Sequence, residues 1–555
     1  MLPLTILALA TSLSLVCADG QFRSRPDLAP PKLNITIPAT DDVAPGYIFI
    51  GAYPGFEGAR AGPEQPAGYI FRNNGDMVWS SLGYLAGWVG NFQAVRYKGQ
   101  PVLQAFQGSL DPFHGHGYGT PVLLDQSYNQ VAKLQSLTHK LISIHEFKIV
   151  NEKTALVEIY QPKAIDLTPY GGRDEEVWIV DGVFQEIDIE TGKLLFEGHT
   201  LDFASPAGTF LHQMRMREHV CLHATTDSYI PLRSGRAFTG LNASDAWDYF
   251  HINSVDKNDE GDYLISGRHM SALYKISGKT GGLLWQLGGG NTTFVHNFNF
   301  GYQHDARFLN QSADGTVETI SFFDNSARSD RQRTGGVDYL HPHSRARIVQ
   351  LNHTDGTAIE VQTFNPPDLL SAPSQGNAQV LENGNVFVNW GQAGAVTEFT
   401  ADGSPIFHAY LDSGILALGA QSYRGFRYEW DGYPRETPAL VVIQDGDQTA
   451  AYVSWNGDTH THSWRFYTRC RSVSWGNSER VRTYQVGEVE RVSFESSLVF
   501  STTIARCTEE GQVFAEAIDA NGAVLVTTDA VRIQVSGKSA YLNAQQAEQY
   551  AVRGL

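Results

Sequence analysis

Short runs of β-branched and aromatic residues, each bounded by Gly, Asp or Asn, follow one another from about residue 46 to residue 430. Apolar runs of this length between turn residues are typical of β-strands joined by tight turns. Long stretches with the 3.6-residue period of an amphipathic helix are nearly absent before the terminal segment 540–555. The pattern therefore predicts an all-β chain.

A hairpin of similar form recurs along this part of the chain. Each copy consists of a strand, a turn that contains glycine and a second strand, and the copies begin at Gly68, Val183, Leu273, Ala346 and Ala395. Units of four short antiparallel strands that recur every few tens of residues are typical of a β-propeller, and the spacing predicts roughly six blades between residues 46 and 430. Stacked β-sandwiches would use the same hairpins and are the alternative. The repeated glycine turn favours a closed ring, in which each blade meets a similar neighbour.

The flanks of this region differ from it in composition. Residues 19–45 contain five prolines and predict an extended N-terminal segment rather than a domain. Residues 431–535 indicate about seven further strands with a buried Trp455, like a small immunoglobulin or fibronectin type III sandwich. Residues 536–555 form a C-terminal tail in this prediction.

The first 18 residues predict a signal peptide. The run Leu4–Val16 is mostly apolar but too short to span a bilayer, and Val16-Cys17-Ala18 fits the small-residue rule for cleavage. A buried N-terminal strand or helix is the alternative. Five glycosylation sequons agree with export, at Asn34, Asn242, Asn291, Asn310 and Asn352. We therefore expect a secreted protein without a membrane anchor.

Three cysteines remain after removal of the leader. A secreted context favours a disulfide, and Cys470 with Cys507 is the expected pair because both lie in the C-terminal segment. Cys221 is then expected to be a buried free thiol. No Cys-x-x-Cys or other zinc spacing is present, and His460 and His462 lack a third ligand. We therefore expect no metal site.

Composition indicates a globular protein, and the net charge argues against two classes of partner. The chain has 42% hydrophobic and 18% charged residues, as an ordinary globular protein does. Its 41 basic and 59 acidic residues leave a net charge of -18. Nucleic acid and anionic membrane surfaces are disfavoured, because contact with phosphate needs Lys and Arg.

The candidate chemistry lies in the stretch Trp247–Phe308, where His251, Arg268 and His304 each occupy a strand edge within a short apolar frame. His251 and Arg268 are 17 residues apart, a spacing that suits one antiparallel hairpin. Both side chains can then reach the same end of a blade. Two imidazoles and a guanidinium can together hold and transfer a compact anionic group.

Three frames in this stretch resemble the aryl sulfate sulfotransferase family, in particular its secreted fungal branch. They are His251-Ile-Asn-Ser-Val255, Ser266-Gly-Arg268-His269 and Gln303-His304. The resemblance extends over most of residues 46–430. A fourth family histidine precedes a strand–turn–strand and is matched by His145, although Asn151-Glu-Lys replaces the usual Asn-Gly turn. The N-terminal sandwich of bacterial relatives is not evident in this chain.

The resemblance implies an enzyme that moves a sulfuryl group from an aryl sulfate donor to a phenolic acceptor through a sulfohistidine. Carried over residue by residue, His304 is the nucleophile and His251 is the acid that protonates the leaving phenolate. His251 then deprotonates the incoming phenol, while His145 and Arg268 hold the sulfuryl oxygens. The family route needs no cofactor and no nucleotide sulfonate donor, and no Gly-rich phosphate loop is visible in the sequence.

These residue types suit that reaction. Sulfuryl transfer resembles phosphoryl transfer, in which charge spreads over the peripheral oxygens and positioned cations dominate catalysis. A guanidinium offers a planar fork for two oxygens, and a neutral imidazole is a competent nucleophile near pH 7.

Other interpretations remain. A single histidine in a β-protein is more often a structural hydrogen-bonding residue, and for His145 the two interpretations are balanced. His114 and His116 lie in a glycine-rich loop and could line the mouth of the site, but turn geometry explains the glycines equally well. Since fold does not fix function, the pocket could instead isomerise or cyclise a small metabolite. The chain could also be a non-catalytic secreted binding protein.

Overall fold

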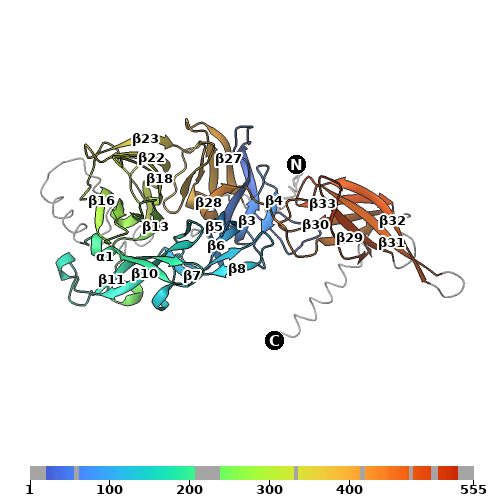
Figure 1. The fold of residues 1–555 in the computed structure, drawn as a ribbon. Coiled ribbons are helices and arrows are strands. Elements are labelled where there is room, and N and C mark those ends of the chain that lie inside the picture. The colour runs from blue at the N-terminus through green and yellow to red at the C-terminus, as the bar shows by residue number, and fades with distance from the viewer. Residues whose placement is uncertain are drawn as a thin grey trace, which may run out of the picture.

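The computed structural model describes residues 20–55, 62–206, 238–330, 336–412, 419–473, 479–501 and 511–535. In these ranges strands form almost all of the regular secondary structure (Figure 1), so the prediction of an all-β chain is confirmed. The predicted leader, the tail 536–555, Cys221 and the Cys470–Cys507 pair fall outside the residues or side chains described. No helix within the described ranges has the length and apolar character needed to cross a membrane.

Six mainly antiparallel sheets of four or five strands follow one another between β1 and β28. The first has the order β28 (Ala420–Tyr428), β2 (Tyr47–Pro54), β3 (Ala67–Phe71), β4 (Met77–Ser80). The second is β5 (Trp88–Tyr97), β6 (Gln100–Asp111), β7 (His116–Leu124), β8 (Gln130–Lys133). The third is β9 (Phe147–Val150), β10 (Thr154–Ala164), β11 (Trp178–Asp188), β12 (Leu194–His199).

The remaining three sheets continue this order. The fourth is β13 (Ile252–Lys257), β14 (Tyr263–Gly267), β15 (Ala272–Ile276), β16 (Leu283–Gly288). The fifth is β18 (His304–Gln311), β19 (Val317–Asp324), β22 (Arg345–Asn352), β23 (Thr357–Phe364), β17 (Val295–His296). The sixth is β24 (Asn377–Val380), β25 (Val386–Asn389), β26 (Ala395–Phe399), β27 (Pro405–Asp412), β1 (Lys32–Ile37).

Short elements connect these sheets. A separate ribbon pairs β20 (Ala327–Asp330) with β21 (Gly336–Tyr339). The helical turns are η1 (Leu137–His139), η2 (Thr168–Tyr170), α1 (Thr200–Phe203), η3 (Ala243–Asp245), η4 (Arg268–Met270) and η5 (Gly391–Ala393).

The strand named first in each of the six sheets contacts the strand named first in each of two other sheets, and these contacts form a closed cycle. β28 contacts β5, β5 contacts β9, β9 contacts β13, β13 contacts β18, β18 contacts β24, and β24 contacts β28 again. We call these six the inner strands. Early and late parts of the chain are joined twice, because β2 pairs with β28 and β1 pairs with β27. In Figure 1 the blue strands accordingly lie beside the orange ones.

Strand β2 of the ring is buried on both faces. In β2, Ile48, Phe49 and Ile50 are all fully buried although successive side chains point to opposite faces. Ile48 and Ile50 pack in a cluster with Phe407 of β27, whereas Phe49 packs in another with Leu103 of β6. Each face of β2 is thus covered by a neighbouring sheet, which explains why its sequence is a nearly continuous apolar run instead of an alternating one.

The C-terminal part forms two further sheets around a separate apolar core. One has the order β33 (Glu495–Ser501), β30 (Gln448–Ser454), β29 (Ala439–Asp445), β37 (Gln534–Val535). The other has the order β32 (Glu479–Glu490), β31 (Ser463–Val473), β34 (Gln512–Ile518), β35 (Val524–Thr527), with β36 (Val531–Arg532) paired to β34. Trp455 is buried as expected, and its indole N–H donates to the carbonyl of Glu436 at 2.7 Å.

Specific hydrogen bonds hold this C-terminal part against the ring. The side chain of Asn456 accepts from the N–H of Ser80 at 2.9 Å and donates to its carbonyl at 3.0 Å. The hydroxyl of Tyr128 donates to the carbonyl of Gly457 at 2.6 Å and accepts from the indole of Trp430 at 3.1 Å.

A buried arginine joins the inner strands at the centre of the ring. Arg424 of β28 donates to the side-chain oxygen of Asn91 at 2.7 Å, to Glu146 at 2.8 Å and to the carbonyl of Asn253 at 3.0 Å. Its Nε lies 3.3 Å from Asp305. These partners belong to, or directly precede, inner strands of four other sheets, so one side chain ties five sheets together.

A second arginine completes the network. Arg307 lies 2.9 Å from Glu146 and 2.6 Å from Asp305. Burial alone would raise the pKa of Glu146, but the two guanidinium groups lower it to about 2. Glu146 is therefore ionised in the folded protein, and its charge is balanced within the network.

Replacing Arg424 by Ala is expected to lower the free energy of unfolding by about 3–5 kcal/mol, because Glu146 and Asp305 would keep buried charge with one cation fewer. Urea denaturation followed by tryptophan fluorescence measures the change. The control is Lys98→Ala, which removes the exposed pair between Lys98 and Glu190 and should shift stability by less than about 1 kcal/mol. Equal urea midpoints for the two variants would contradict the stabilising role given to Arg424.

Candidate active site

The four residues predicted from the sequence line one pocket at the end of the ring where inner strands begin. His145 lies just before β9, His251 lies just before β13, and His304 is the first residue of β18. Arg268 lies in η4, between β14 and β15. Equivalent positions on successive sheets therefore converge, although they lie far apart along the chain.

His251 and Arg268 are neighbours across one hairpin, as their spacing predicted. β13 and β14 pair with Ile252 opposite Gly267, and the N–H of Arg268 donates to the carbonyl of His251 at 3.1 Å. The hairpin that follows His145 also forms, because Asn151 and Glu152 both adopt left-handed φ values of 50° and 56°. Two such residues are what a tight hairpin turn requires.

Hydrogen bonds determine which nitrogen of His304 carries the proton. The amide of Asn325 donates to the carbonyls of Ala372 and Gln375 at 2.7 and 2.8 Å. Its oxygen is thereby directed at Nδ1 of His304, 2.7 Å away, and accepts from it. Nε2 keeps a lone pair, which accepts a longer hydrogen bond of 3.2 Å from the N–H of Gln375. Burial and then the charge of Arg268 lower the pKa of His304 well below its usual value. His304 is thus a neutral imidazole with a lone pair on Nε2.

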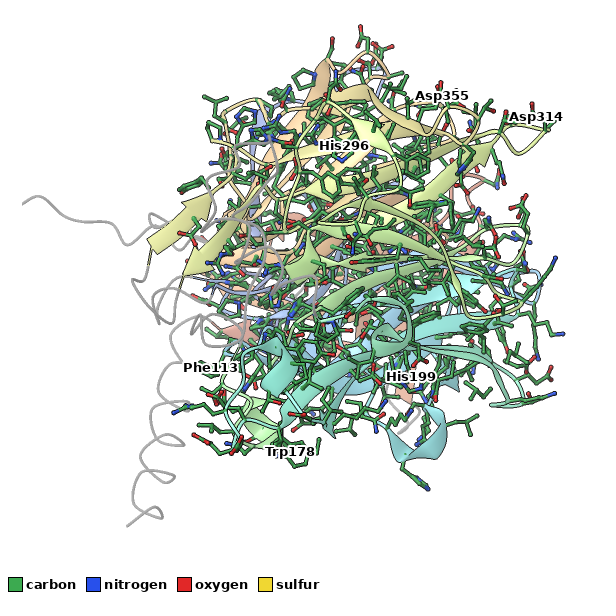
Figure 2. All side chains as sticks on the ribbon, turned by 90° about the vertical axis from the view of Figure 1, so that its left-hand side faces the viewer. Phe113, Trp178, His199, His296, Asp314 and Asp355 are labelled. Atoms are coloured by element: carbon green, nitrogen blue, oxygen red, sulfur yellow. The ribbon has the colours of Figure 1, made fainter. Side chains whose placement is uncertain are left out.

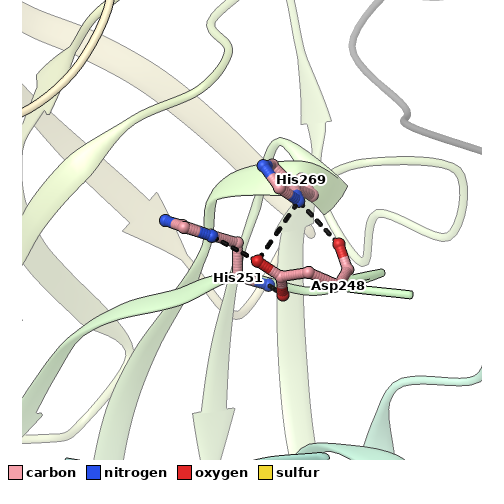
Figure 3. A group of neighbouring side chains, drawn as sticks. All are labelled: Asp248, His251 and His269. Atoms are coloured by element: carbon pink, nitrogen blue, oxygen red, sulfur yellow. Dashed lines mark hydrogen bonds and ion pairs between the residues drawn. The ribbon is translucent and has the colours of Figure 1, made fainter. Parts of the chain in front are cut away.

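His251 is oriented by a buried carboxylate (Figure 3). Asp248 accepts from the backbone N–H of His251 at 3.1 Å, and its other oxygen lies 2.5 Å from Nδ1 of the same residue. Nδ1 of His269 donates to the carbonyl of Asp248 at 2.6 Å. Burial opposes ionisation of Asp248, but attraction to His251 outweighs it and the pKa of Asp248 falls below its usual value. The carboxylate can therefore stabilise positive charge on His251.

Asp248, His251 and His269 also form a group whose potential metal ligand atoms lie within 4.8 Å of one another. Both Nδ1 atoms point to oxygens of Asp248, and this hydrogen bonding accounts for the cluster without an ion. Asp248 thereby orients both imidazole rings.

Arg268 brings a positive charge into the pocket. Its Nη2 donates to the carbonyl of Pro373 at 2.9 Å, and its guanidinium lies 5.4 Å from the ring centre of Tyr302. Among the described residues it forms no ion pair with a carboxylate. Burial lowers the pKa of Arg268 to about 10, so the group remains protonated at neutral pH. A buried cation without a carboxylate partner creates a strong preference for an anionic ligand.

His145 and Tyr423 also line the pocket. Nδ1 of His145 lies 3.0 Å from the hydroxyl oxygen of Ser143, and its ring meets those of His251 and Tyr423 edge-on at 5.1 and 5.6 Å. Burial, followed by the neighbouring His251, lowers the pKa of His145 well below its usual value. Burial raises the pKa of Tyr423, so the phenol is neutral. Its hydroxyl has no hydrogen-bond partner among the described residues and lines the pocket.

The backbone is unusual at this end of the ring. His251 and Gln375 have positive φ values of 52° and 67°, which are uncommon for residues other than glycine. Such conformations are strained and cluster at functional sites, where the surrounding structure holds them. Here each turns a side chain at the start of an inner strand toward the pocket.

Sequence reasoning did not identify several residues that shape the pocket. Asp248 lies three residues before His251, so the Asp-x-x-His spacing is a local signal that could have revealed it. Asn325, Gln375 and Tyr423 have no comparable signal, because their contacts with the histidines join distant parts of the chain.

Comparison with known proteins identifies the class of protein. A model of the arylsulfotransferase (ASST) family matches residues 93–411, more than half of the 555 residues. The chain therefore belongs to the arylsulfotransferase family. Membership indicates a sulfotransferase-like enzyme that acts on aryl sulfates without a nucleotide sulfonate donor. No curated protein matches the sequence.

Solved structures show only distant likeness. A Bacteroides caccae protein of unknown function has 12% identity and a TM-score of 0.33, over 66% of this chain and 93% of its own. AztD from Citrobacter koseri has 9% identity and a TM-score of 0.29, over 70% and 98%. An inactive virginiamycin B lyase from Staphylococcus aureus has 8% identity and a TM-score of 0.22, over 71% and 88%. Likeness at this level carries no argument about function.

The lowered pKa of His304 predicts a specific dependence of stability on pH. Below about pH 6.5 the unfolded chain binds a proton at this residue and the folded chain does not, so stability falls as pH falls, by up to about 1.4 kcal/mol per pH unit. His304→Gln is therefore expected to lose less stability than the wild type between pH 7 and pH 5. Urea midpoints at both pH values measure the difference. Parallel losses in both proteins would contradict the buried neutral state.

Proposed function

We propose that this protein transfers a sulfuryl group from a phenolic sulfate ester to a phenolic acceptor through a sulfohistidine at His304. The observation that carries the proposal is the pairing of a lone pair on Nε2 of His304 with the uncompensated charge of Arg268 in one pocket. A neutral nucleophile beside a fixed cation suits an anionic electrophile, because the cation stabilises charge on the transferred group.

In the first half-reaction, Nε2 of His304 attacks the sulfur of the donor. The N–S bond forms, the bond between sulfur and the aryl oxygen breaks, and the electron pair stays on that oxygen. The protonated imidazole of His251 gives its Nε2 proton to the leaving phenolate. Asp248 supports the imidazolium before this transfer, because its carboxylate holds Nδ1–H of His251.

The second half-reaction reverses these roles. Nε2 of His251 takes the proton of the incoming phenol, whose oxygen attacks the sulfur on His304. The O–S bond forms, the N–S bond breaks, and the electron pair returns to Nε2 of His304. Arg268 and His145 hold the sulfuryl oxygens in both steps, and a guanidinium suits this role because it can donate two parallel hydrogen bonds.

We further propose that the six sheets are the blades of a six-bladed β-propeller over residues 46–430, followed by an immunoglobulin- or fibronectin III-like sandwich over 431–535. The closed cycle of inner strands supports the first assignment, and the two sheets around one core support the second. In this proposal β1 is an outer strand contributed by the N-terminal segment 19–45.

We also propose that the protein is secreted and belongs to the secreted fungal branch of the family. The apolar leader over residues 1–18 supports export. The five sequon asparagines support it too, since all are at least partly accessible to solvent in the fold. A secreted enzyme also fits a reaction that draws on a sulfate ester instead of a cytosolic nucleotide donor.

His304→Ala is expected to abolish release of 4-nitrophenolate from 4-nitrophenyl sulfate, because the sulfuryl group then has no acceptor nitrogen. Absorbance of nitrophenolate measures the rate, and circular dichroism checks the fold. The matched control is His296→Ala, a histidine of β17 outside the pocket, which should retain the wild-type rate. Undiminished release by His304→Ala would reject the nucleophile assignment.

Asp248→Asn is expected to lower kcat on the order of 10²-fold or more, since general acid–base catalysis is typically worth that much. The neutral amide oxygen can still accept from Nδ1–H of His251, but it no longer supplies the negative charge that stabilises the imidazolium. Donors with better leaving groups need less proton donation and should suffer a smaller loss. A loss of equal size for 4-nitrophenyl sulfate and phenyl sulfate would contradict the role of His251 as an acid.

A further inference from the structure

Two Asp–His pairs of the same construction face the pocket. One is Asp248-Tyr-Phe-His251 and the other is Asp111-Pro-Phe-His114. In each, one carboxylate oxygen accepts from the backbone N–H of the histidine, at 3.1 Å for His251 and 3.3 Å for His114. The other oxygen lies 2.5 Å from Nδ1 of the histidine in both pairs. The proposed reaction uses only the first pair.

The second pair lies at the tip of the β6–β7 hairpin. β6 ends at Asp111 and β7 begins at His116, so residues 112–115 form the connecting loop. A Cβ atom on Gly115 would lie 3.4 Å from Cε1 of His251, and Gly115 has a φ of 77°. The loop therefore rests against the imidazole of His251. Figure 2 shows Phe113 on the opposite side of the view from Asp314 and Asp355, which lie on turns of the fifth sheet.

His114 presents an unused acceptor atom to the pocket. Because the carboxylate of Asp111 accepts, the proton of this hydrogen bond lies on Nδ1, and Nε2 is the ring nitrogen left for a ligand. Nε2 is buried and has no hydrogen-bond partner among the described residues. The ring packs against Phe238 at 4.4 Å and Phe113 at 5.1 Å. A hydrogen-bond acceptor between two aromatic rings suits a hydroxyl group carried on an aromatic ring.

Turn geometry does not account for this atom. Asp111 also accepts from the N–H of Phe113 at 2.9 Å, and its carbonyl accepts from Gly115 at 2.9 Å, so the carboxylate shapes the loop. These contacts explain Asp111 and the direction of Nδ1. They leave Nε2 of His114 unsatisfied, which costs free energy unless a ligand supplies a donor.

The reacting oxygen is not the partner of His114. In a two-step transfer through His304, the leaving phenolate and the incoming phenol occupy the same position opposite Nε2 of His304. His251 serves that oxygen in both steps. A second, similarly oriented histidine at the mouth is therefore available for another polar group on the same aromatic molecule.

We propose that His114 is a specificity-determining residue that accepts a hydrogen bond from a second hydroxyl group on the phenolic acceptor. The preferred acceptors are accordingly dihydroxyaryl compounds, with Phe113 and Phe238 packing on the ring. This inference rests on the proposed sulfuryl transfer, and it assigns the class of acceptor that the family match leaves open.

The test compares hydroquinone with 4-methoxyphenol as acceptors, with 4-nitrophenyl sulfate as donor. The two phenols differ only by a methyl group on the far oxygen, which removes the hydrogen-bond donor. Wild-type kcat/KM is expected to favour hydroquinone about tenfold, because the methyl ether leaves Nε2 unsatisfied. His114→Phe keeps the aromatic packing and removes Nε2, so it should lower only the value for hydroquinone and abolish the preference. His114→Gln, whose side-chain oxygen can accept, should restore part of it.

A second measurement separates this inference from the proposed function. Without acceptor, one equivalent of nitrophenolate should be released by the wild type as His304 is sulfated. His296→Phe is the control for an aromatic replacement outside the pocket. Two outcomes overturn the inference while the proposed function stands, provided that the wild type gives the burst. In one, His114→Phe keeps the full preference for hydroquinone over 4-methoxyphenol. In the other, the wild type shows no such preference. Absence of the burst in the wild type overturns the proposed function and this inference with it.

Discussion

The buried guanidinium of Arg424 is the interaction on which the centre of this molecule depends. It contacts side chains or carbonyls at the inner strands of four sheets besides its own, and Arg307 shares two of its acidic partners. Desolvating these charges is costly, so the network is stable only when all its members are present together. Its geometry therefore requires five of the six sheets to be assembled. The network holds the inner strands in register, and the pocket side chains extend from the beginnings of those same strands.

The pocket combines the guanidinium groups of Arg268 and Arg328 with buried imidazoles, of which His145 and His304 have pKa values well below the usual one. Burial lowers the pKa of the Arg268 guanidinium and that of the His304 imidazole, but the protonation state at neutral pH differs between the two. The guanidinium of Arg268, with a pKa of about 10, stays charged, whereas the lowered pKa of His304 keeps its Nε2 unprotonated near neutrality. At His251 the carboxylate of Asp248 lies against Nδ1 and orients the ring. This combination of groups in one pocket supports the sulfuryl transfer proposed above.

Much of the site could be predicted from short segments. The frames around His251, Arg268 and His304 lie next to strand ends, and the spacing of the first two matches a hairpin that the structure contains. The tautomer of His304 could not be predicted, because it depends on Asn325 and on the carbonyls that orient Asn325. The same holds for the place of β1. Its segment is extended as expected, but its pairing with β27 joins Lys32 to Asp412, 380 positions apart in the chain.

The sequence by itself determined which segments become strands and where they turn, because alternation, β-branching and glycine act over a few residues. It also carried the Asp-x-x-His turns, whose hydrogen bonds are local. Only the tertiary structure decided that the beginnings of separate sheets meet around one pocket, and that the His114 turn lies beside the His251 turn. The reason is ring closure: the pairing of β2 with β28 and the burial of Arg424 are long-range interactions, which form only when the sheets are assembled.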